Sequence, residues 1–576
     1  MAQAVLILNQ ILLIAIPLVY APFFQHSFTS AKYLSLLLIV AGALVFASLK
    51  ILKSPTIKVE SLKKNQIFIV ASLIFALLGF YTFFSQTPII SLFGTMERKL
   101  GLICYSILFI VFVLNSLFLE KKHFQKILTV IQKTGFVISI YAIMQYLGYD
   151  PLFSSFNSNI FHDRSFSFLG NPSFLGQILC LTSIVNLQQV KSHPNSKLAW
   201  LNFFIQLLAL ILSGTRSSLL AFLIGSCFLF KKQFKKILII LSICLFIFAG
   251  SQAKQFTNSD SINSRISIWQ STIQLVKEKP FGYGIENIQA FFPKVQQASF
   301  NYHEDNPYKT VDKVHNQTLS ILYSTGPLGL ILYAYIIFLL IKILFKSPDS
   351  THKLISLVIL TNLIQNQLNF FDLPTLLIIT ILASFLKQSQ VKQTLQVSKV
   401  YTVVALILSL SIFNFTIKQA YAEINYKSYN QNFHNDYQAA QKHLDRSLQQ
   451  TPYYAKLWVE LGYSNLEQRL RTYVGLKKLE NSSPQSKIWI AKYLEPSYPK
   501  ISENIFQQLH KLNPQNPVWL FELTSFYQRQ NQTQNFLNSK NTILNLFPEI
   551  QDAQTHKAKT FIQNMPEYHN FFPTTH

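Results

Sequence analysis

The stretch Lys313-Val-His-Asn-Gln-Thr-Leu319 ends a long polar segment and leads directly into an apolar run. The polar segment covers residues 251–316, and the nine apolar runs before it are joined by much shorter connectors. A loop of this length inside a compact architecture is usually either functional or disordered, and this one is too rich in aromatic residues for disorder. We therefore expect the large loop to carry function and to place His315 at the start of a helix.

Apolar runs near the length needed to cross a bilayer recur through the first 418 residues. Half of the 576 residues are hydrophobic and only 13% are charged, a composition unlike that of soluble globular proteins. We count thirteen runs, at residues 5–24, 33–49, 67–84, 102–119, 127–147, 168–187, 198–212, 217–230, 237–250, 319–344, 354–368, 373–386 and 400–417. The sequence therefore predicts an all-α polytopic membrane protein with about 13 transmembrane helices, within a range of 11–14 because several runs are short.

The net charge of +25 is concentrated in alternate connectors between the runs. Twenty lysines lie in one set of alternate connectors, which includes residues 50–66 and 231–236, whereas the other short connectors carry only five basic residues. By the positive-inside rule, the lysine-rich set faces the cytoplasm, so the large loop and everything after residue 418 lie on the other side. Because topology accounts for most of the basic excess, we expect no nucleic-acid partner.

All arginines of the short connectors, Arg98, Arg164 and Arg216, lie in the second set. Arginine offers a planar fork that grips a phosphate with two parallel hydrogen bonds, whereas lysine is a strongly hydrated point charge. Two of the three have a plainer alternative, Arg98 as an interfacial anchor and Arg164 as a partner of Asp163. Arg216 lies between two short apolar runs, where a charge near bilayer depth is costly and usually functional. We therefore predict that Arg216 binds an anionic group.

A fourth arginine, Arg265, stands four residues before Trp269 on a predicted interfacial helix of the large loop. Its plainer alternative is a salt bridge to Glu278 or Glu286. We predict a functional role for Arg265 and keep the salt bridge as the alternative.

A lone histidine at a helix start is more often a capping or surface residue than a catalyst. His315, however, lies at the predicted membrane face beside Asn316, just before Gly326-Pro-Leu-Gly329, whose proline can bend the helix. Its rival in the same loop is His303, in a stretch that is typical of an exposed loop. We therefore favour His315 as the titratable group of the site.

The chain has no Asp-x-Asp pair and no cluster of His, Cys and Asp at ligand spacing, so the sequence predicts neither a metal nor a cofactor. The four cysteines lie inside apolar runs, which implies no disulfide framework. They are Cys104, Cys180, Cys227 and Cys244.

Taken together, five spacings resemble the O-antigen ligase family of bacterial membrane glycosyltransferases. They are Arg164-x5-Gly-Asn-Pro, Gly-Thr-Arg216-Ser-Ser, Arg265-x3-Trp, Lys-Pro-Phe-Gly-Tyr-Gly284 and His315-Asn-x9-Gly-Pro-Leu-Gly. The resemblance covers roughly residues 93–372, including the order of the motifs and the place of the large loop. The superfamily also contains polysaccharide polymerases and protein O-oligosaccharyltransferases, and the motifs do not separate these subfamilies.

The resemblance implies transfer of a glycan from a polyprenyl-pyrophosphate carrier to an acceptor hydroxyl, outside the bacterial cytoplasmic membrane and without nucleotide or metal. Preorganised arginines stabilise a leaving diphosphate, and a histidine is the usual base for a hydroxyl proton. On this basis His315 is the general base, and Arg216 and Arg265 bind the diphosphate. Arg164 and Arg98 are weaker candidates for the same anion, and Asn316 is a further substrate contact.

After residue 418 the composition becomes rich in Gln, Asn, Lys and Tyr and compatible with helices. Trp458-x2-Leu-Gly462 fits the tetratricopeptide pattern, and a second register runs from Leu520 to Pro548. A period near 34 residues is the signature of such stacked helix pairs. We therefore predict a membrane glycosyltransferase domain at 1–418 and an extracytoplasmic tetratricopeptide-like domain at 419–576. Such repeats present a concave face to protein partners, although a helical cap without a partner is the alternative.

Two readings from outside the enzyme class remain. A transporter or flippase for a lipid-linked glycan would also place arginines at a cavity, but it would need no base at His315 and usually shows related halves. A scaffold that recruits partners would leave thirteen spans without a purpose. Within the enzyme reading, the acceptor is a lipid core, a growing glycan or a protein, and the C-terminal repeats favour a protein or a large assembly.

Overall fold

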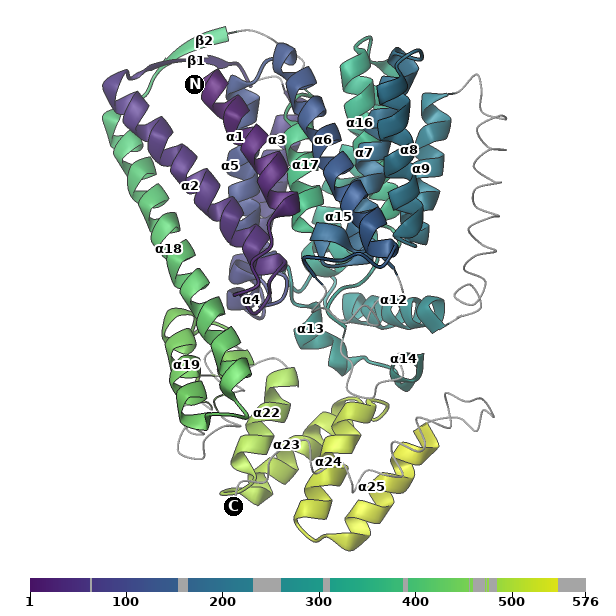
Figure 1. Cartoon of the computed structure of the whole chain (residues 1–576). Coiled ribbons are helices and arrows are strands. Elements are labelled where there is room, and N and C mark those ends of the chain that lie inside the picture. The colour runs from purple at the N-terminus through teal and green to yellow at the C-terminus, as the bar shows by residue number, and fades with distance from the viewer. Residues whose placement is uncertain are drawn as a thin grey trace. The chain divides into compact units, whose positions relative to one another are not determined.

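The computed structural model describes residues 1–62, 65–153, 164–230, 260–303, 311–386, 392–454 and 484–546, with a few single positions between 456 and 475. Most of these residues lie in helices (Figure 1). The predicted all-α fold class is confirmed, and so is the polytopic membrane character: five helices are long and apolar enough to cross a membrane, and five shorter apolar helices accompany them. One two-stranded antiparallel sheet, β1(Thr56–Glu60) with β2(Lys392–Gln396), occurs in the described part.

Twelve of the thirteen predicted runs coincide with a described helix, and the ninth run, 237–250, lies outside the described residues. These helices are α1(Ala2–Leu18), α2(Thr29–Lys53), α3(Gln66–Phe83), α5(Leu102–Phe118), α6(Lys121–Tyr146), α7(Pro172–Ser192), α8(Lys197–Leu212), α9(Arg216–Leu229), α15(Gln317–Lys346), α16(Ser350–Gln365), α17(Leu373–Ala383) and α18(Lys399–Asn432). α18 runs without interruption past residue 418, so the last helix extends well beyond its apolar run.

The chain forms two compact units. The first contains residues 1–80, 92–251 and 328–451, and the second contains residues 81–91, 252–327 and 452–576. The division into a domain at 1–418 and a repeat domain at 419–576 stays a prediction.

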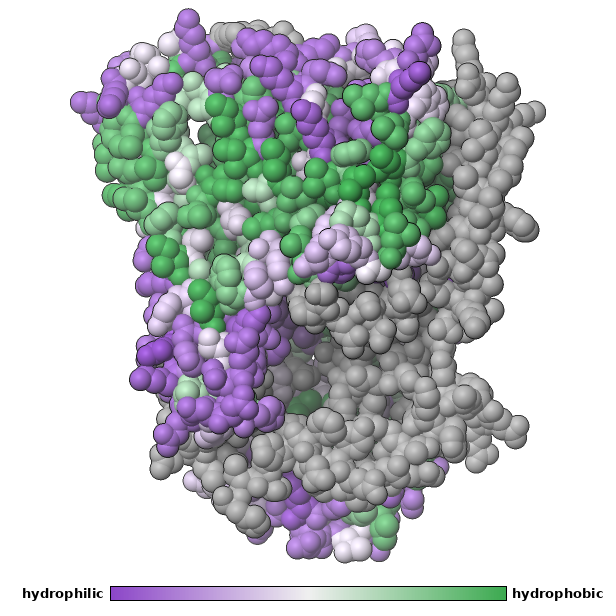
Figure 2. All heavy atoms as spheres, viewed as in Figure 1, coloured by the Kyte–Doolittle hydropathy of each residue, from purple (hydrophilic) through white to green (hydrophobic). Residues whose placement is uncertain are grey.

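The first unit is a helical bundle with one continuous apolar core, to which α1, α2, α5, α7 and α16 contribute fully buried side chains. α18 packs along α2, and α19(Tyr437–Gln450) packs back on α18. Figure 2 shows a band of hydrophobic side chains across these helices, bordered by hydrophilic side chains at the end that carries β1 and β2. An outward apolar band of this kind is what lipid requires of a multi-pass membrane protein.

Several connectors of the lysine-rich set meet at one end of the first unit, the end that carries the two-stranded sheet. β1 and β2 come from two of them and pair from Thr56↔Gln396 to Glu60↔Lys392. Lys121 Nζ lies 2.8 Å from an Asp349 carboxylate oxygen, which joins two more of these connectors. The alternation that groups the connectors by sequence therefore agrees with their positions in space.

The second unit combines the large loop with the C-terminal helices. The loop contributes α12(Asp260–Glu278), α13(Ile288–Phe291), the 3-10 turn η4(Phe292–Lys294) and α14(Ala298–His303), and 81–91 contributes α4(Pro88–Phe93) in part. The C-terminal part contributes α22(Pro484–Leu494), α23(Pro499–Leu512), α24(Pro517–Arg529) and α25(Thr533–Leu546), each packed on the next. Contacts between successive helices fit a helical repeat, but the tetratricopeptide assignment stays a prediction.

Candidate functional site

Arg164 holds the turn that presents Arg216. Its Nε donates to the Ser213 carbonyl oxygen at 2.9 Å, and its Nη2 donates to Thr215 Oγ1 at 3.2 Å. Gly214 lies between these two residues with φ +63°, and a Cβ there would lie 2.8 Å from Arg164 Nε. Only glycine therefore lets the guanidinium lie along this turn. The alternative partner of Arg164, Asp163, lies outside the described residues.

The same turn is tied to the start of α7. Thr215 Oγ1 donates to the Pro172 carbonyl oxygen at 2.9 Å, and the Asn171 side chain caps α7 by accepting from Ser173 N–H at 2.8 Å. The Gly-Asn-Pro and Gly-Thr-Arg motifs, which are more than forty residues apart in the sequence, thus form one structural element.

Arg216 is the first residue of α9, and its side chain is exposed. The N-terminus of a helix carries a partial positive charge and unpaired N–H groups, so a cation at this position is electrostatically unfavourable unless an anion binds there. A helix start that also carries a guanidinium is well suited to a phosphate group.

Arg98 lies over two phenylalanine rings. Its guanidinium carbon is 5.5 Å from the centroid of the Phe174 ring and 4.9 Å from that of Phe370. Phe174 belongs to the first turn of α7, and Phe370 belongs to the connector before α17. The backbone oxygen of Phe370 accepts from Gln177 Nε2 of α7 at 2.5 Å. The two aromatic faces hold the guanidinium by cation–π attraction.

Two charged residues of this region were not recognised from the sequence as part of a site. Lys32 is buried, and its Nζ donates to the carbonyl oxygens of Val19 and Phe168, at 2.8 Å each. Asp372 caps α17, and burial raises the pKa of its carboxyl to about 6, against the opposing effects of Thr375 and Lys32. A lysine beside an apolar run looks like any topology signal, so its burial was not readable from composition.

These contacts place five cations in or beside the connectors at one end of the first unit. We call this region, defined by Lys32, Arg98, Lys99, Arg164 and Arg216, the cation end. It includes all arginines that the sequence places in the short connectors.

In the second unit, His315 is held in a left-handed backbone conformation, with φ +55°. A non-glycine residue in this region is uncommon, and such residues cluster at functional sites. The Trp269 indole Nε1 donates to the carbonyl oxygen of Val314 at 3.1 Å, so the tryptophan of the Arg265-x3-Trp motif fixes the residue next to His315. The two motifs are separate in the sequence, and this hydrogen bond joins them.

Asn316 is the N-cap of α15. Its side-chain oxygen accepts from Leu319 N–H at 2.9 Å, and its backbone oxygen accepts from Ser320 N–H at 2.9 Å. The amide of Asn316 therefore has a structural task at the helix start directly after His315, and a substrate contact by Asn316 stays a prediction.

Arg265 lies on α12, one turn before Trp269. Both carboxylates considered as its salt-bridge partners form ion pairs with lysines, Glu278 with Lys294 and Glu286 with Lys313. The second pair is buried, which places a fixed charge pair two residues before His315.

The Lys-Pro-Phe-Gly-Tyr-Gly284 motif fastens the loop to a break in α15. Pro327 has no N–H, so the Tyr323 carbonyl loses its helical donor, and Gly326 departs from helical geometry with φ 61° and ψ −161°. The backbone N–H groups of Tyr283 and Gly284 donate to the carbonyl oxygens of Tyr323 and Ser324, at 2.9 Å each. The motif therefore satisfies the groups that the proline and glycine leave open.

The C-terminal helices hold the same loop from another side. Asn513 Nδ2 donates to the carbonyl oxygens of Pro293 and Gln296, at 3.1 and 2.9 Å, and Asn516 Nδ2 donates to Pro293 at 2.6 Å. Both amides are buried. The helices after residue 484 and the loop that carries Arg265 and His315 are therefore parts of one folded unit.

Three predicted site residues, Arg98, Arg164 and Arg216, thus lie in the first unit, and Arg265, His315 and Asn316 lie in the second. His303 ends α14, and its side chain lies outside the described residues. Within the described part of the chain, no three His, Cys, Asp or Glu side chains are placed to hold a metal ion. A metal-independent mechanism stays a prediction.

A comparison with known families gives a match. Residues 201–334 match a family described as O-antigen ligase, and this segment contains Arg216, Arg265, His315 and the break in α15. A search among curated proteins gives no match to the chain.

Proposed function

We propose that this chain, a multi-pass membrane protein of the O-antigen ligase superfamily, moves a glycan from a polyprenyl-pyrophosphate carrier to an acceptor hydroxyl. The observation that carries the proposal is the cation end, where exposed Arg216 occupies the positively polarised start of α9 and Arg164 holds its turn. An arrangement that repels cations and attracts phosphate groups is what a lipid diphosphate requires.

In the proposed reaction, the acceptor oxygen attacks the anomeric carbon of the lipid-linked glycan. His315 takes the hydroxyl proton as the new carbon–oxygen bond forms, while the bond to the diphosphate breaks and the lipid diphosphate leaves. Negative charge grows on the leaving group, and Arg216 and Arg265 stabilise it, with Arg98 and Arg164 in supporting roles. The imidazolium then returns its proton to solvent.

Within this superfamily, a ligase that uses a lipid acceptor is the first choice, and a polysaccharide polymerase or a protein O-oligosaccharyltransferase is the alternative. The three differ only in the molecule that offers the hydroxyl. A transporter for the lipid-linked glycan is the alternative from another class, and the strained backbone at His315 beside a fixed tryptophan is the feature that favours chemistry over transport.

The test is transfer by the purified full-length protein in detergent. We expect loss of glycan from an undecaprenyl-diphosphate donor and its appearance on an added acceptor, at a rate unchanged by a metal chelator. The contrary result is that the glycan stays on its carrier with every acceptor class, while the donor crosses the membrane of proteoliposomes. That result would contradict the transferase and favour the transporter.

The proposed reaction takes place outside the cytoplasm, at the bacterial inner membrane. Because lysine-rich connectors mark the cytoplasmic face, the cation end, the large loop and the C-terminal helices belong outside. Protease added to intact spheroplasts should remove a tag at the C-terminus and spare one in the connector at 193–196. The reverse pattern, with the connector cut and the C-terminus protected, would invert the topology and remove the basis of the site.

A further inference from the structure

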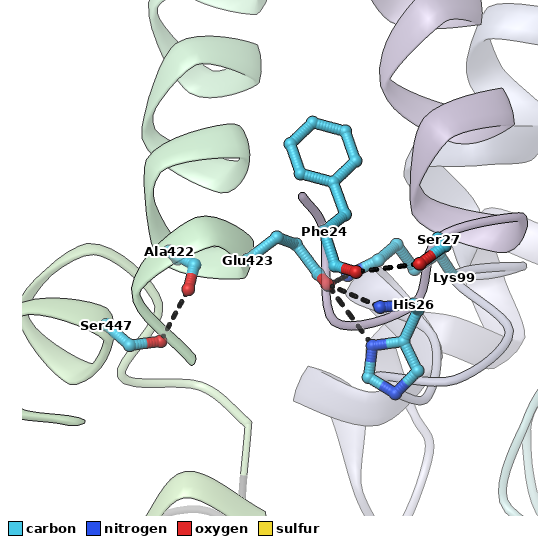
Figure 3. Close-up of polar contacts among 7 residues, drawn as sticks. All are labelled: Phe24, His26, Ser27, Lys99, Ala422, Glu423 and Ser447. Atoms are coloured by element: carbon cyan, nitrogen blue, oxygen red, sulfur yellow. Dashed lines mark hydrogen bonds and ion pairs between the residues drawn. The ribbon is translucent and has the colours of Figure 1, made fainter. Parts of the chain in front are cut away.

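A buried carboxylate on the last membrane helix joins two connectors of the cation end. The Glu423 side chain is 2% exposed, and its Oε1 lies 2.8 Å from Lys99 Nζ. Its Oε2 accepts from the backbone N–H of His26 at 3.1 Å and lies 3.3 Å from His26 Nδ1 (Figure 3). One carboxylate of α18 thus holds the connector before α2 and the connector before α5.

Because both side chains of this ion pair are buried, the contact between α18 and the turn of Lys99 cannot be broken without leaving a charge unpaired. The Lys99 side chain is completely buried, and the structure gives it Glu423 as a counter-ion. Buried charges persist only when they are paired and hydrogen-bonded, and removing one partner leaves the other uncompensated.

Lys99 belongs to a strained turn. Its φ is +55°, and Gly94 at the start of the turn has φ +80°, with space so limited that a Cβ would lie 2.6 Å from the Leu100 nitrogen. The Thr95 carbonyl oxygen accepts from the N–H groups of both Arg98 and Lys99, at 3.3 and 2.8 Å. A left-handed lysine persists only where its surroundings fix it, and Glu423 fixes this one through its side chain.

Arg98 is the neighbour of Lys99 in this turn, and its guanidinium lies over Phe174 and Phe370. The path of the turn decides where that guanidinium lies. We propose that Glu423 is a positioning residue for Arg98, which it reaches through Lys99, and that α18 thereby sets the geometry of the diphosphate site. This inference rests on the proposed function.

The extension of α18 gives this role a structural basis. The apolar run ends at residue 417, yet the helix continues to Asn432 and carries Glu423 in the added part. The Phe415 ring stacks on the Phe93 ring beside the same turn, with 6.1 Å between the ring centroids. Ser447 Oγ of α19 donates to the Ala422 carbonyl oxygen at 3.0 Å (Figure 3). The α18–α19 hairpin is therefore docked on the turn that carries Arg98.

The experiment is a double-mutant cycle read by binding of undecaprenyl diphosphate to the purified full-length protein. Arg98→Ala removes a charge-assisted contact and should weaken binding about tenfold or more. Glu423→Gln should weaken binding by a similar factor, and the double variant should bind no more weakly than Arg98→Ala alone, because the two changes act through one contact. Glu522→Gln breaks another ion pair with a buried carboxylate, that of Glu522 with Lys492, and should leave binding within about twofold of wild type.

A purely structural Glu423 gives the opposite pattern, in which the two losses multiply. That result, or wild-type binding by Glu423→Gln, overturns the inference. If Glu423→Gln does not accumulate in the membrane, Glu423→Asp serves in the same cycle, since it keeps the charge and shortens the reach by one methylene. Wild-type binding by Arg98→Ala would remove Arg98 from the site and the inference with it, while transfer by Arg216 and His315 variants still tests the transferase.

Discussion

Replacing His315 with alanine should lower glycan transfer by about 10²–10⁴-fold while the lipid-linked donor still binds. The acceptor hydroxyl must lose its proton as it attacks, and loss of a general base typically costs this factor. The structure constrains this residue: His315 has an unfavourable, left-handed backbone conformation, and Trp269 holds the residue before it by a hydrogen bond. The measurement is transfer from a purified undecaprenyl-diphosphate donor, with donor binding measured in parallel.

Two other histidines serve as controls for His315. His303→Ala changes the rival in the same loop, and His193→Ala changes an exposed histidine at the end of α7, in a lysine-rich connector. Both should transfer at close to the wild-type rate. Near-normal transfer by His315→Ala, or equal losses from His303→Ala and His315→Ala, would exclude His315 as the base and favour the transporter.

Local pattern was enough to predict much of the fold. Hydropathy located twelve helices, because a bilayer imposes its own length on apolar runs, and the alternation of lysine grouped the connectors that the structure brings together. The break in α15 was also readable, since Gly326-Pro327 cannot continue a regular helix. In each case the signal lies within one segment of the chain.

Contacts between connectors were not predictable in the same way. The sequence makes Arg164 a weaker candidate for the anion, with a pair to Asp163 as its alternative. The structure gives two of its nitrogens to the turn of Arg216. Lys32, Lys99 and Glu423 are buried against partners that lie far away in the sequence. Neither the local spacing nor the local composition of the sequence therefore indicates that they are buried. Asn513 and Asn516 belong to the same class, because an amide that binds a distant backbone oxygen leaves no periodic pattern.

This difference separates residues that are in the site from residues that hold it. Motif spacing predicts Arg216, Arg265 and His315 as site residues, where the proposed chemistry itself demands a residue type. It did not predict which contacts support them, because many residue types at many positions satisfy a supporting contact. The structure supplies that layer, with Arg164 behind Arg216 and Trp269 beside His315.

Replacing Arg216 with lysine should be nearly as damaging to transfer as replacing it with alanine. We expect both variants to lose about 10²–10³-fold, the usual effect of removing a preorganised donor from a developing anion. Lysine keeps the positive charge but offers a single point of contact, and it cannot form two parallel hydrogen bonds with a diphosphate. Because the side chain of Arg216 is exposed at the start of α9, neither change leaves a cavity, and membrane abundance should stay normal.

Lys197 is a closely matched control for Arg216. It is also the exposed first residue of an apolar helix, α8, but it lies at the lysine-rich end of the same unit. Lys197→Ala and Lys197→Arg should both transfer normally, which would show that a cation at a helix start is not by itself required. Initial rates over a series of donor concentrations would separate the two effects of Arg216→Lys, and we expect the larger loss in kcat, since the diphosphate charge grows as the bond to the glycan breaks. Full activity of Arg216→Lys at normal abundance would reduce Arg216 to a generic cation and move the diphosphate site elsewhere.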